Sequence, residues 1–306
     1  MTDIADHFAA AEPLSLFSAT PGQVRFSYSK PDDIFWKRFI IRGIERLTGQ
    51  PQLERLYRCW SADDDHQGDN VFKAGLRLMN IALHVNKQAL LKAPTEGALL
   101  IIANHPFGVV DGLAVMELAL RIRPDVKIMV HSLLCKPPEA NGYLLPVDFG
   151  GTPEARATSA ATRRRTVDWL ERGHCVVIFP SGGVATAQKP FTANATDSAW
   201  HEFVARLARI PKLKILPIFF HGQNSRIFQI ASHIHYALRV ALLFRESARR
   251  MGGAIAATVG AAIEADTLPH AQGRKAVVKH LRKVTFALGG QDGENAFVWP
   301  KHIRWD

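Results

Sequence analysis

The sequence has few cysteines and no long apolar run. Its 306 residues include three cysteines, Cys59, Cys135 and Cys175, which lie far apart and show no C-x-x-C spacing. This usage argues against a disulfide scaffold or a cysteine-based metal site, so we expect reduced thiols in a cytosolic compartment. The longest clean apolar stretch, 252–263, is shorter than the roughly 18 residues that a membrane-spanning helix needs. The amino-terminal residues 1–14 carry acids where a signal peptide carries basic residues, so we expect no secretion.

The sequence also has fewer acidic than basic residues, with 28 Asp and Glu against 38 Lys and Arg. The formal net charge is +10 at pH 7 and the sequence pI is about 9.7. Such a surface favours anionic partners, which include nucleic acid, anionic lipid headgroups and an acidic carrier protein. A nucleic-acid-binding protein would interleave aromatic residues with Lys and Arg on an exposed platform, or carry a recognisable binding motif. The sequence shows neither, so we expect no nucleic-acid partner.

The middle of the chain alternates short apolar runs with helical patterns. The strand-like runs are 96–104, 126–131, 144–149, 175–180 and 213–222. The helical patterns between them include 112–124, 157–173 and 200–210, and a helix running into a strand occupies 72–86. This order predicts an α/β fold whose largely parallel central sheet is flanked by helices. We expect three parts: an N-terminal arm with amphipathic helices (1–69), an α/β domain (70–265), and a basic C-terminal helix with a tail (266–306).

An amphipathic helix is expected at 32–49. Apolar and aromatic side chains, among them Phe35 and Phe39, alternate there with Lys and Arg. Residues 53–60 continue with a second helix of the same kind. A helix that packs on the core with a solvated face gives this pattern, and so does a helix lying in a membrane interface. The pattern alone leaves both interpretations open.

The stretch ANHPFGVVDG places a histidine and an acid near the end of a buried strand. His105 follows the strand, where sites form in open α/β sheets, and Asp111 comes six residues later. A histidine can take a proton from a hydroxyl, and a carboxylate can fix its tautomer and orientation. Pro106 and Gly108 favour a tight turn that brings Asp111 back, and Gly112 relieves crowding near the acid. The spacing alone favours an alternative, a helix-capping Asp beside an unrelated surface His.

Four motifs follow one another along the chain: NHPFGVVDG (104–112), GYLLPVDFG (142–150), VVIFPSGGVAT (176–186) and KILPIFFHGQNSRIFQIA (214–231). In this order they resemble the motifs of the glycerolipid acyltransferases, the lysophosphatidate-acyltransferase-like superfamily. The usual first motif has four residues between His and Asp, whereas this chain has five. That spacing and the GQNSR extension after the fourth motif resemble the hemolysin-like, lyso-ornithine-lipid acyltransferase branch. The resemblance covers about residues 70–265.

The resemblance implies O-acyl transfer. His105 would act as the general base on a lyso-lipid hydroxyl, oriented by Asp111, and the acyl donor would be a thioester of acyl carrier protein or CoA. The carrier protein is slightly preferred as the donor because the chain is basic. No metal and no cofactor are implied. The resemblance assigns substrate binding to Asn104, Pro106, Phe107, Gly108, Gly112, Asp148, Phe179, Pro180, Ser181, Gly182, Gly183, Pro217, His221 and Arg226.

The third motif departs from the family. Ser181 stands where a Glu is usual, Gly183 stands where a Thr is usual, and no Arg follows. The next charged side chain is Lys189. A lyso-aminolipid such as lyso-ornithine lipid is therefore favoured as the acceptor, with lysophosphatidate as the alternative. A catalytically silent lipid-binding scaffold is a further alternative. Ser181 is not expected to be a nucleophile, because the motif lacks the G-x-S-x-G pattern.

A lyso-lipid substrate favours the interfacial interpretation of the helix at 32–49. We therefore expect a cytoplasmic protein that associates peripherally with the inner face of the cell membrane. The arginine run 163–165 is expected to be a solvated helix face. His221 and Arg226 are the best remaining candidates for lining the pocket. We expect structural or surface roles for the other histidines, His131, His174, His201, His233 and His235.

Overall fold

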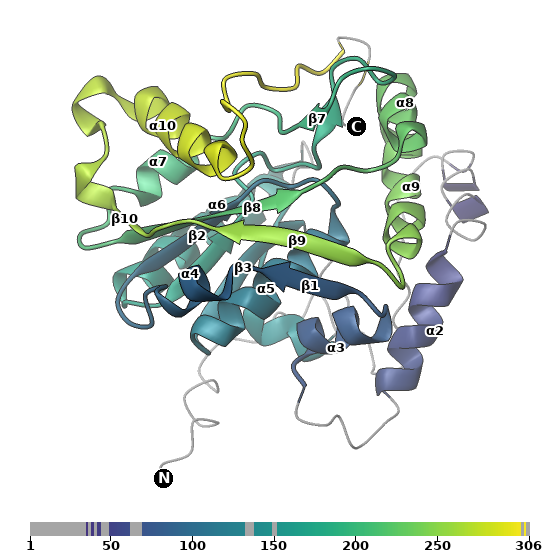
Figure 1. The fold of residues 1–306 in the computed structure, drawn as a ribbon, viewed down its shortest axis with the longest axis horizontal. Coiled ribbons are helices and arrows are strands. Elements are labelled where there is room, and N and C mark those ends of the chain that lie inside the picture. Colours follow the sequence, from purple (N-terminus) through teal and green to yellow (C-terminus); the bar gives the residue numbers. More distant parts are fainter. Residues whose placement is uncertain are drawn as a thin grey trace.

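A central sheet organises the chain (Figure 1). The computed structural model describes residues 35, 38–39, 42–43, 49–61, 69–131, 138–148, 152–300 and 303. Within these residues the sheet has eight strands in the order β1-β9-β8-β2-β5-β3-β4, and β10 pairs with β8 at one end. Its strands are β1 (Ala82–Val85), β2 (Leu99–Ala103), β3 (Val126–His131), β4 (Leu144–Val147), β5 (Cys175–Ile178), β8 (Lys214–His221), β9 (Ala254–Val259) and β10 (Ile263–Glu264).

Most strand pairs are parallel. β2 lies between β8 and β5 and runs parallel to both, with Ala103 opposite Ile218 and Ile102 opposite Ile178. β5 with β3, β3 with β4, and β1 with β9 are also parallel. In the described sheet, only the pairs that β9 and β10 form with β8 are antiparallel. The predicted α/β fold with a largely parallel sheet is therefore confirmed.

The sheet is covered on both faces. β2 reads LLIIA and is buried along its whole length, as expected for a strand between two helical layers. Leu99, Ile101 and Ala103 pack into the first core, whereas Leu100 and Ile102 pack into the second. The helices of the first core are α3 (Val71–Leu78) and α5 (Val109–Ile122), with the short α4 (Lys87–Leu91) beside them. Those of the second core are α6 (Pro153–Glu171), α7 (Phe203–Leu207) and α10 (Arg274–Ala287) (Figure 1).

Local sequence explains where these helices begin. The side chain of Asn70 accepts the backbone N–H groups of Phe72 and Lys73 at the start of α3. Thr152 caps α6 in the same way, and Pro153 occupies its first position, where its missing N–H costs nothing. α10 is held to the sheet by an apolar stripe that includes Leu281. The predicted domain boundary at residue 265 stays a prediction, although α10 shares the second core with α6 and α7.

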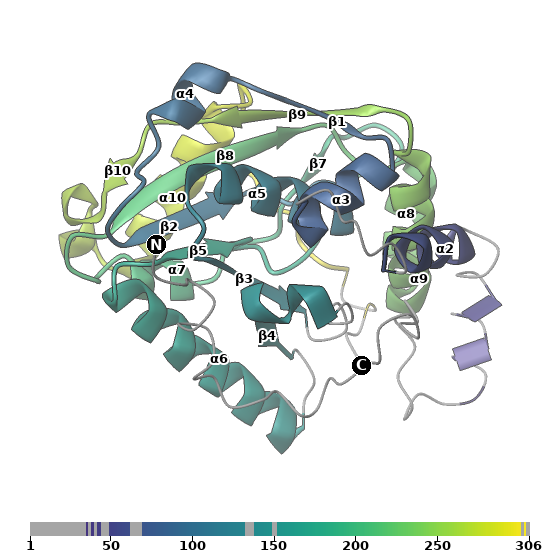
Figure 2. The same cartoon turned by 90° about the horizontal axis from the view of Figure 1, so that it is seen from below.

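Three helices lie at the end of the sheet where β2, β5 and β8 finish. They are α2 (Gln50–Ser61), α8 (Arg226–Ile234) and α9 (Tyr236–Arg249), and α9 contacts α2, α5 and α8 (Figure 2). The small antiparallel pair β6 (Thr186–Ala187) and β7 (Ala195–Thr196) lies close to α8. Short 3-10 helices span Pro138–Tyr143, Ala265–Thr267 and His270–Gln272.

Some elements differ from the sequence-based expectation. The helix expected at 200–210 is shorter, because α7 spans only Phe203–Leu207. The apolar stretch 252–263 contributes strands β9 and β10. Most of the helix expected at 32–49 lies outside the described residues, but residues 35, 38–39 and 42–43 are helical. No helix in the described part of the chain is long and apolar enough to cross a membrane.

Candidate active site

His105 and Asp111 meet at the end of β2. The Nδ1 atom of His105 lies 3.0 Å from Oδ2 of Asp111. The Asp111 side chain is fully buried, whereas 16% of the His105 side chain is exposed. His105 is therefore accessible on one side while its carboxylate partner is shielded from solvent, which is the arrangement of a base and its orienting acid.

The turn between the two residues wraps around the carboxylate. Oδ2 of Asp111 also accepts the backbone N–H groups of Phe107, at 2.6 Å, and Gly108, at 2.9 Å. Asp111 lies in the first turn of α5, where the helix dipole favours a negative charge. These donors stabilise a buried carboxylate that would otherwise be costly.

Gly108 makes the turn possible. Its φ of +91° and ψ of −119° lie in a region that residues with a Cβ rarely adopt. A Cβ on Gly108 would also lie 3.2 Å from Leu243 and 3.3 Å from Val184. The fifth residue between His105 and Asp111 is accommodated here, so the longer spacing does not separate the pair.

Asn104 fixes the chain just before His105. Its side-chain amide donates to the carbonyl of Phe220 at 2.9 Å and accepts the N–H of Phe220 at 2.7 Å. Asn104 therefore extends the pairing of β2 with β8 by one step through its side chain. Phe107 is buried beneath the turn, with the guanidinium of Arg250 4.0 Å from its ring centre.

A second buried acid, Asp197, holds the backbone of His105. Its Oδ1 accepts the N–H of His105 at 3.1 Å, and its Oδ2 accepts Nε1 of Trp200 at 2.9 Å. Burial raises the pKa of Asp197, and these hydrogen bonds and the charge of Arg282 oppose that rise. Sequence reasoning missed Asp197, because it lies in a loop, about ninety residues after His105, with no motif around it.

The loop after β5 forms one wall of the site. The ring of Phe179 stacks on the imidazole of His105, with ring centres 4.0 Å apart and planes 20° apart. Ser181 donates its hydroxyl to the carbonyl of Gly183 at 2.9 Å, so it stabilises the loop. Pro180 accepts the backbone N–H of His201. The third motif thus places an aromatic face and small residues beside His105.

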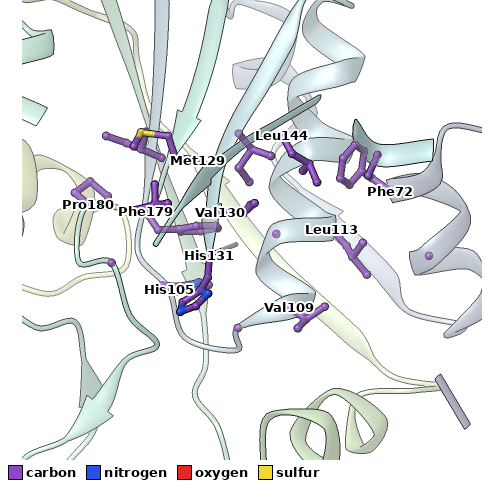
Figure 3. A pocket seen from close by; sticks show the side chains of 18 of the residues that line it. Phe72, His105, Val109, Leu113, Met129, Val130, His131, Leu144, Phe179 and Pro180 are labelled. Atoms are coloured by element: carbon purple, nitrogen blue, oxygen red, sulfur yellow. The ribbon is translucent and has the colours of Figure 1, made fainter. Parts of the chain in front are cut away.

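A cavity of about 690 Å³ opens at His105 (Figure 3). Such a volume suits a small-molecule or lipid substrate. Toward α2, α3 and α5 it is lined by apolar side chains, which include Leu56, Phe72 and Leu113. Toward α6 and α7 it is lined by Met129, Phe203 and several charged residues. In Figure 3 Met129 and Pro180 lie near Phe179 and His105, and Leu113 and Phe72 lie farther from them.

The structure brings part of the expected site together. Asp111 lies directly behind His105, and Asn104, Pro106 and Phe107 belong to the same turn. Nine expected substrate-binding residues do not line the cavity, and these include Asn104, Pro106, Phe107, Ser181 and Gly183. The other four lie elsewhere: the Asp148 backbone bonds Ser159, Pro217 lies within β8, His221 bonds Thr258, and Arg226 bonds the carbonyls of Pro190 and Ala193. Ser181 and Gly183 lie in the adjoining loop. The cavity-lining residues among those expected are His105, Gly108, Gly112, Phe179, Pro180 and Gly182.

Three residues outside the predicted site also line the cavity. The run 163–165 is exposed on α6, as expected for a solvated helix face, and Arg163 in addition lines the cavity. His131 and His201, for which structural or surface roles are expected, line it as well. Sequence periodicity could not find these residues, because they come from three separate elements whose approach depends on the sheet order.

The remaining histidines have structural partners. His174 bonds Asp125 at 2.8 Å and packs on Trp169. His233 bonds the carbonyl of Ala187, and the His235 side chain accepts the N–H of Ala237 at the start of α9. Across the ranges that the structure describes, no group of three or more His, Cys, Asp or Glu side chains is placed to hold a metal ion.

Comparison with known proteins identifies the family. No curated protein matches the sequence. Among solved structures, the crystal structure of the 1-acyl-sn-glycerophosphate (LPA) acyltransferase PlsC from Thermotoga maritima is similar, with a TM-score of 0.46 and 12% sequence identity over 83% of this chain and 88% of that chain. Residues 56–290 match a protein-family model described as Acyltransferase. Because this match spans well over half of the sequence and includes all four motifs, the chain belongs to the acyltransferase family and is an enzyme of acyl-group transfer.

Proposed function

We propose that the protein moves a fatty acyl group from an acyl carrier protein or CoA thioester to the hydroxyl of a lyso-lipid. The observation that carries this proposal is the pairing of His105 with the buried Asp111 beside a largely apolar cavity. Such a pair provides a base for the hydroxyl, and the cavity provides a place for the acyl chain.

His105 acts as the general base in this proposal. Because the Asp111 carboxylate can only accept, the hydrogen of the imidazole lies on Nδ1, and Nε2 keeps its lone pair. Nε2 has no hydrogen-bond partner within the described residues and belongs to a cavity-lining side chain. It takes the proton as the acceptor oxygen attacks the thioester carbonyl carbon. The C–S bond then breaks, and His105 returns the proton to the departing thiolate.

Phe179 supports the base through geometry. The stacked ring limits rotation of the imidazole, so Nε2 keeps one direction toward the cavity. The hydrogen bonds of Asn104 and Asp197 hold the backbone just before His105 and at its own N–H group. Orientation of this kind supports a reaction in which no covalent acyl-enzyme forms.

The favoured acceptor is a lyso-aminolipid such as lyso-ornithine lipid, as in the hemolysin-like branch. The third-motif loop presents Phe179, Pro180 and Gly182 to the cavity, and none of these residues carries a charge. A phosphate headgroup held by this loop would lack a cationic side chain there. Lysophosphatidate remains the alternative acceptor.

A peripheral position on the inner face of the cell membrane is also proposed. Phe35 and Phe39 belong to helical segments and are 80% and 72% exposed. Exposed aromatic side chains on a helix rich in Lys and Arg suit the interface of an anionic bilayer. Such a position would give the enzyme access to a lyso-lipid in the membrane.

The test is an acyl-transfer assay. Purified protein is incubated with labelled acyl carrier protein or acyl-CoA and a panel of lyso-lipids that includes lyso-ornithine lipid and lysophosphatidate. We expect transfer to lyso-ornithine lipid, and loss of that transfer in His105→Ala. Undiminished transfer in His105→Ala would refute the mechanism. Failure of every acceptor, with the folded wild-type protein, would support the silent scaffold instead.

A further inference from the structure

The sheet opens next to His105. β3 pairs with β5 only from Val126 to Ile128, but it continues to pair with β4 as far as His131. From Met129 onward, β3 therefore has no pairing partner on the β5 side within the described sheet. Phe179 and Pro180, which follow β5, lie across this gap and line the same cavity.

The cavity passes through this gap. Successive side chains of a strand point to opposite faces, yet Ile128, Met129, Val130 and His131 all line the cavity. Ile128 belongs to the core under α3 and α5, and Met129 packs against the core under α6, α7 and α10. One cavity thus reaches both faces of the sheet, and Met129, Val130, Phe179 and His105 lie close together on its wall (Figure 3).

The two ends of the cavity differ in chemistry. The end under α2, α3 and α5, which we call the apolar lobe, is lined by residues such as Leu53, Leu78 and Leu113. The end at α6, α7 and α10, which we call the arginine mouth, is lined by Arg163, Arg206 and Arg274.

The arginine mouth has a surplus of positive charge. All three arginines are exposed, and none of them forms an ion pair with another described residue. Glu202 is the one acid among the described lining residues. Two causes lower the pKa of His201: partial desolvation, which is the larger, and the charge of Arg163. This histidine therefore adds no charge at neutral pH. Guanidinium groups are well suited to binding phosphate.

We propose that Arg163, Arg206 and Arg274 bind a phosphate of the acyl donor's thiol carrier, and that the donor threads the gap between β3 and β5. This inference rests on the proposed function. The thioester carbonyl has to lie beside His105, the acyl chain occupies the apolar lobe, and the thiol half leaves toward the opposite face. The pantetheine arm, shared by CoA and acyl carrier protein, is uncharged between its sulfur and its phosphate. Uncharged side chains such as Met129, Val147 and Val204 line the cavity as well.

The acceptor phosphate fits this mouth less well. The headgroup of a small lyso-lipid is only a few bonds from its reacting hydroxyl, so it stays close to His105. The arginines come from α6, α7 and the first residue of α10, all on the far side of the gap. A group joined to the reacting centre by a long arm is therefore the better occupant.

Glutamine variants with matched neighbours test the proposal. Arg163→Gln, Arg206→Gln, Arg274→Gln and the triple variant are compared with the triple control Arg164→Gln, Arg209→Gln and Lys275→Gln. The control residues are exposed, lie on the same helices or directly after them, and do not line the cavity. The measurements are KM and kcat with acyl-CoA, acyl carrier protein and acyl-pantetheine, together with the calorimetric Kd for free CoA.

The triple variant should raise KM for acyl-CoA at least about tenfold, as expected for loss of charge-assisted hydrogen bonds, with little change in kcat. Acyl-pantetheine, which has no phosphate, should show no difference between the triple variant and wild type. If KM rises for both acyl-CoA and acyl carrier protein, the arginines bind the phosphopantetheine phosphate. If KM rises for acyl-CoA alone, they bind a phosphate of the nucleotide half.

Two results would overturn the inference while leaving the proposed function intact. One is unchanged KM and Kd for CoA in the triple variant. The other is a rise in KM for lysophosphatidate, but not for the donor, which would assign the arginines to the acceptor. The CoA titration needs no turnover. Loss of CoA binding in the triple variant would therefore support the arginine mouth even if no acceptor in the panel were acylated.

Discussion

The Nδ1 atom of His105 lies 3.0 Å from Oδ2 of Asp111, and the latter oxygen also receives two backbone N–H groups from the turn between them. One oxygen therefore orients the imidazole and closes the turn. A change at Asp111 affects the tautomer of the base and the shape of the loop together.

Asp111→Asn should abolish most activity while leaving a folded protein. An amide has nearly the same shape and its oxygen can still accept the three N–H groups, but it carries no charge. The imidazolium that forms when His105 takes the proton then loses the stabilisation of the buried carboxylate. We expect kcat to fall by roughly 10²- to 10⁴-fold, the usual contribution of general base catalysis. Steady-state acyl-transfer kinetics provide the measurement.

The control for Asp111→Asn is His280→Ala, an exposed histidine on α10 that does not line the cavity. It should keep wild-type activity. If Asp111→Asn retained wild-type kcat, the charge of Asp111 would have no part in catalysis by His105.

Gly108→Ala and Gly112→Ala should have opposite effects on stability. Gly108 adopts a positive φ, and an added Cβ would crowd Leu243 and Val184, so we expect a loss of about 1–3 kcal/mol. Gly112 lies in α5 with nothing within 4 Å of an added Cβ, so alanine should stabilise the protein by about 0.5–1 kcal/mol. Urea unfolding of both variants measures the difference. If Gly108→Ala and Gly112→Ala changed the free energy of unfolding equally, a side chain at position 108 would not strain the turn.

The sequence predicted the parts of the site that lie close together in the chain. His105, Asp111 and the turn between them fall within ten residues, and β2 is an unbroken apolar run, so local rules were sufficient. The class of fold followed from the alternation of strands and helices. The third-motif loop was also predicted, because it directly follows β5.

The parts contributed by distant elements could not be predicted in this way. Asp197 reaches the backbone of His105 from a loop, and Arg163, Arg206 and Arg274 meet only because α6, α7 and α10 cover one face of the sheet. The gap between β3 and β5 depends on how many residues of the two strands pair with each other, and the hydrophobic periodicity of the sequence does not predict that number. His221 lies at the end of a strand, as motif order indicated, yet it bonds Thr258 and does not line the cavity.

Asp197 should make stability depend on pH. Burial raises its pKa above the ordinary value of 3.8, so the folded state binds this proton more tightly than the unfolded state. The stabilisation is therefore fully present below about 3.8 and is lost as pH rises through the folded-state pKa. Asp197→Asn removes this titration.

Urea unfolding of wild type and Asp197→Asn across the acid range tests this expectation. The free energy of unfolding of wild type minus that of the variant should decrease as pH rises above 3.8 and then level off. Other carboxylates titrate in both proteins, so they cancel in the difference. A difference that stays flat or increases with pH would contradict a raised pKa for Asp197.

The apolar lobe should set the preferred acyl-chain length. Leu113 lines the lobe on α5, away from His105 in Figure 3. Leu113→Trp adds bulk there, so the end of a long chain loses buried contact while the thioester still reaches the base. Each methylene excluded from the lobe costs about 0.8 kcal/mol, or roughly a fourfold fall in kcat/KM. The ratio of kcat/KM for long-chain to short-chain donors should therefore fall in Leu113→Trp and stay near the wild-type value in the volume-conserving Leu113→Met. Equal losses for both donors in a stably folded Leu113→Trp would place the acyl chain elsewhere.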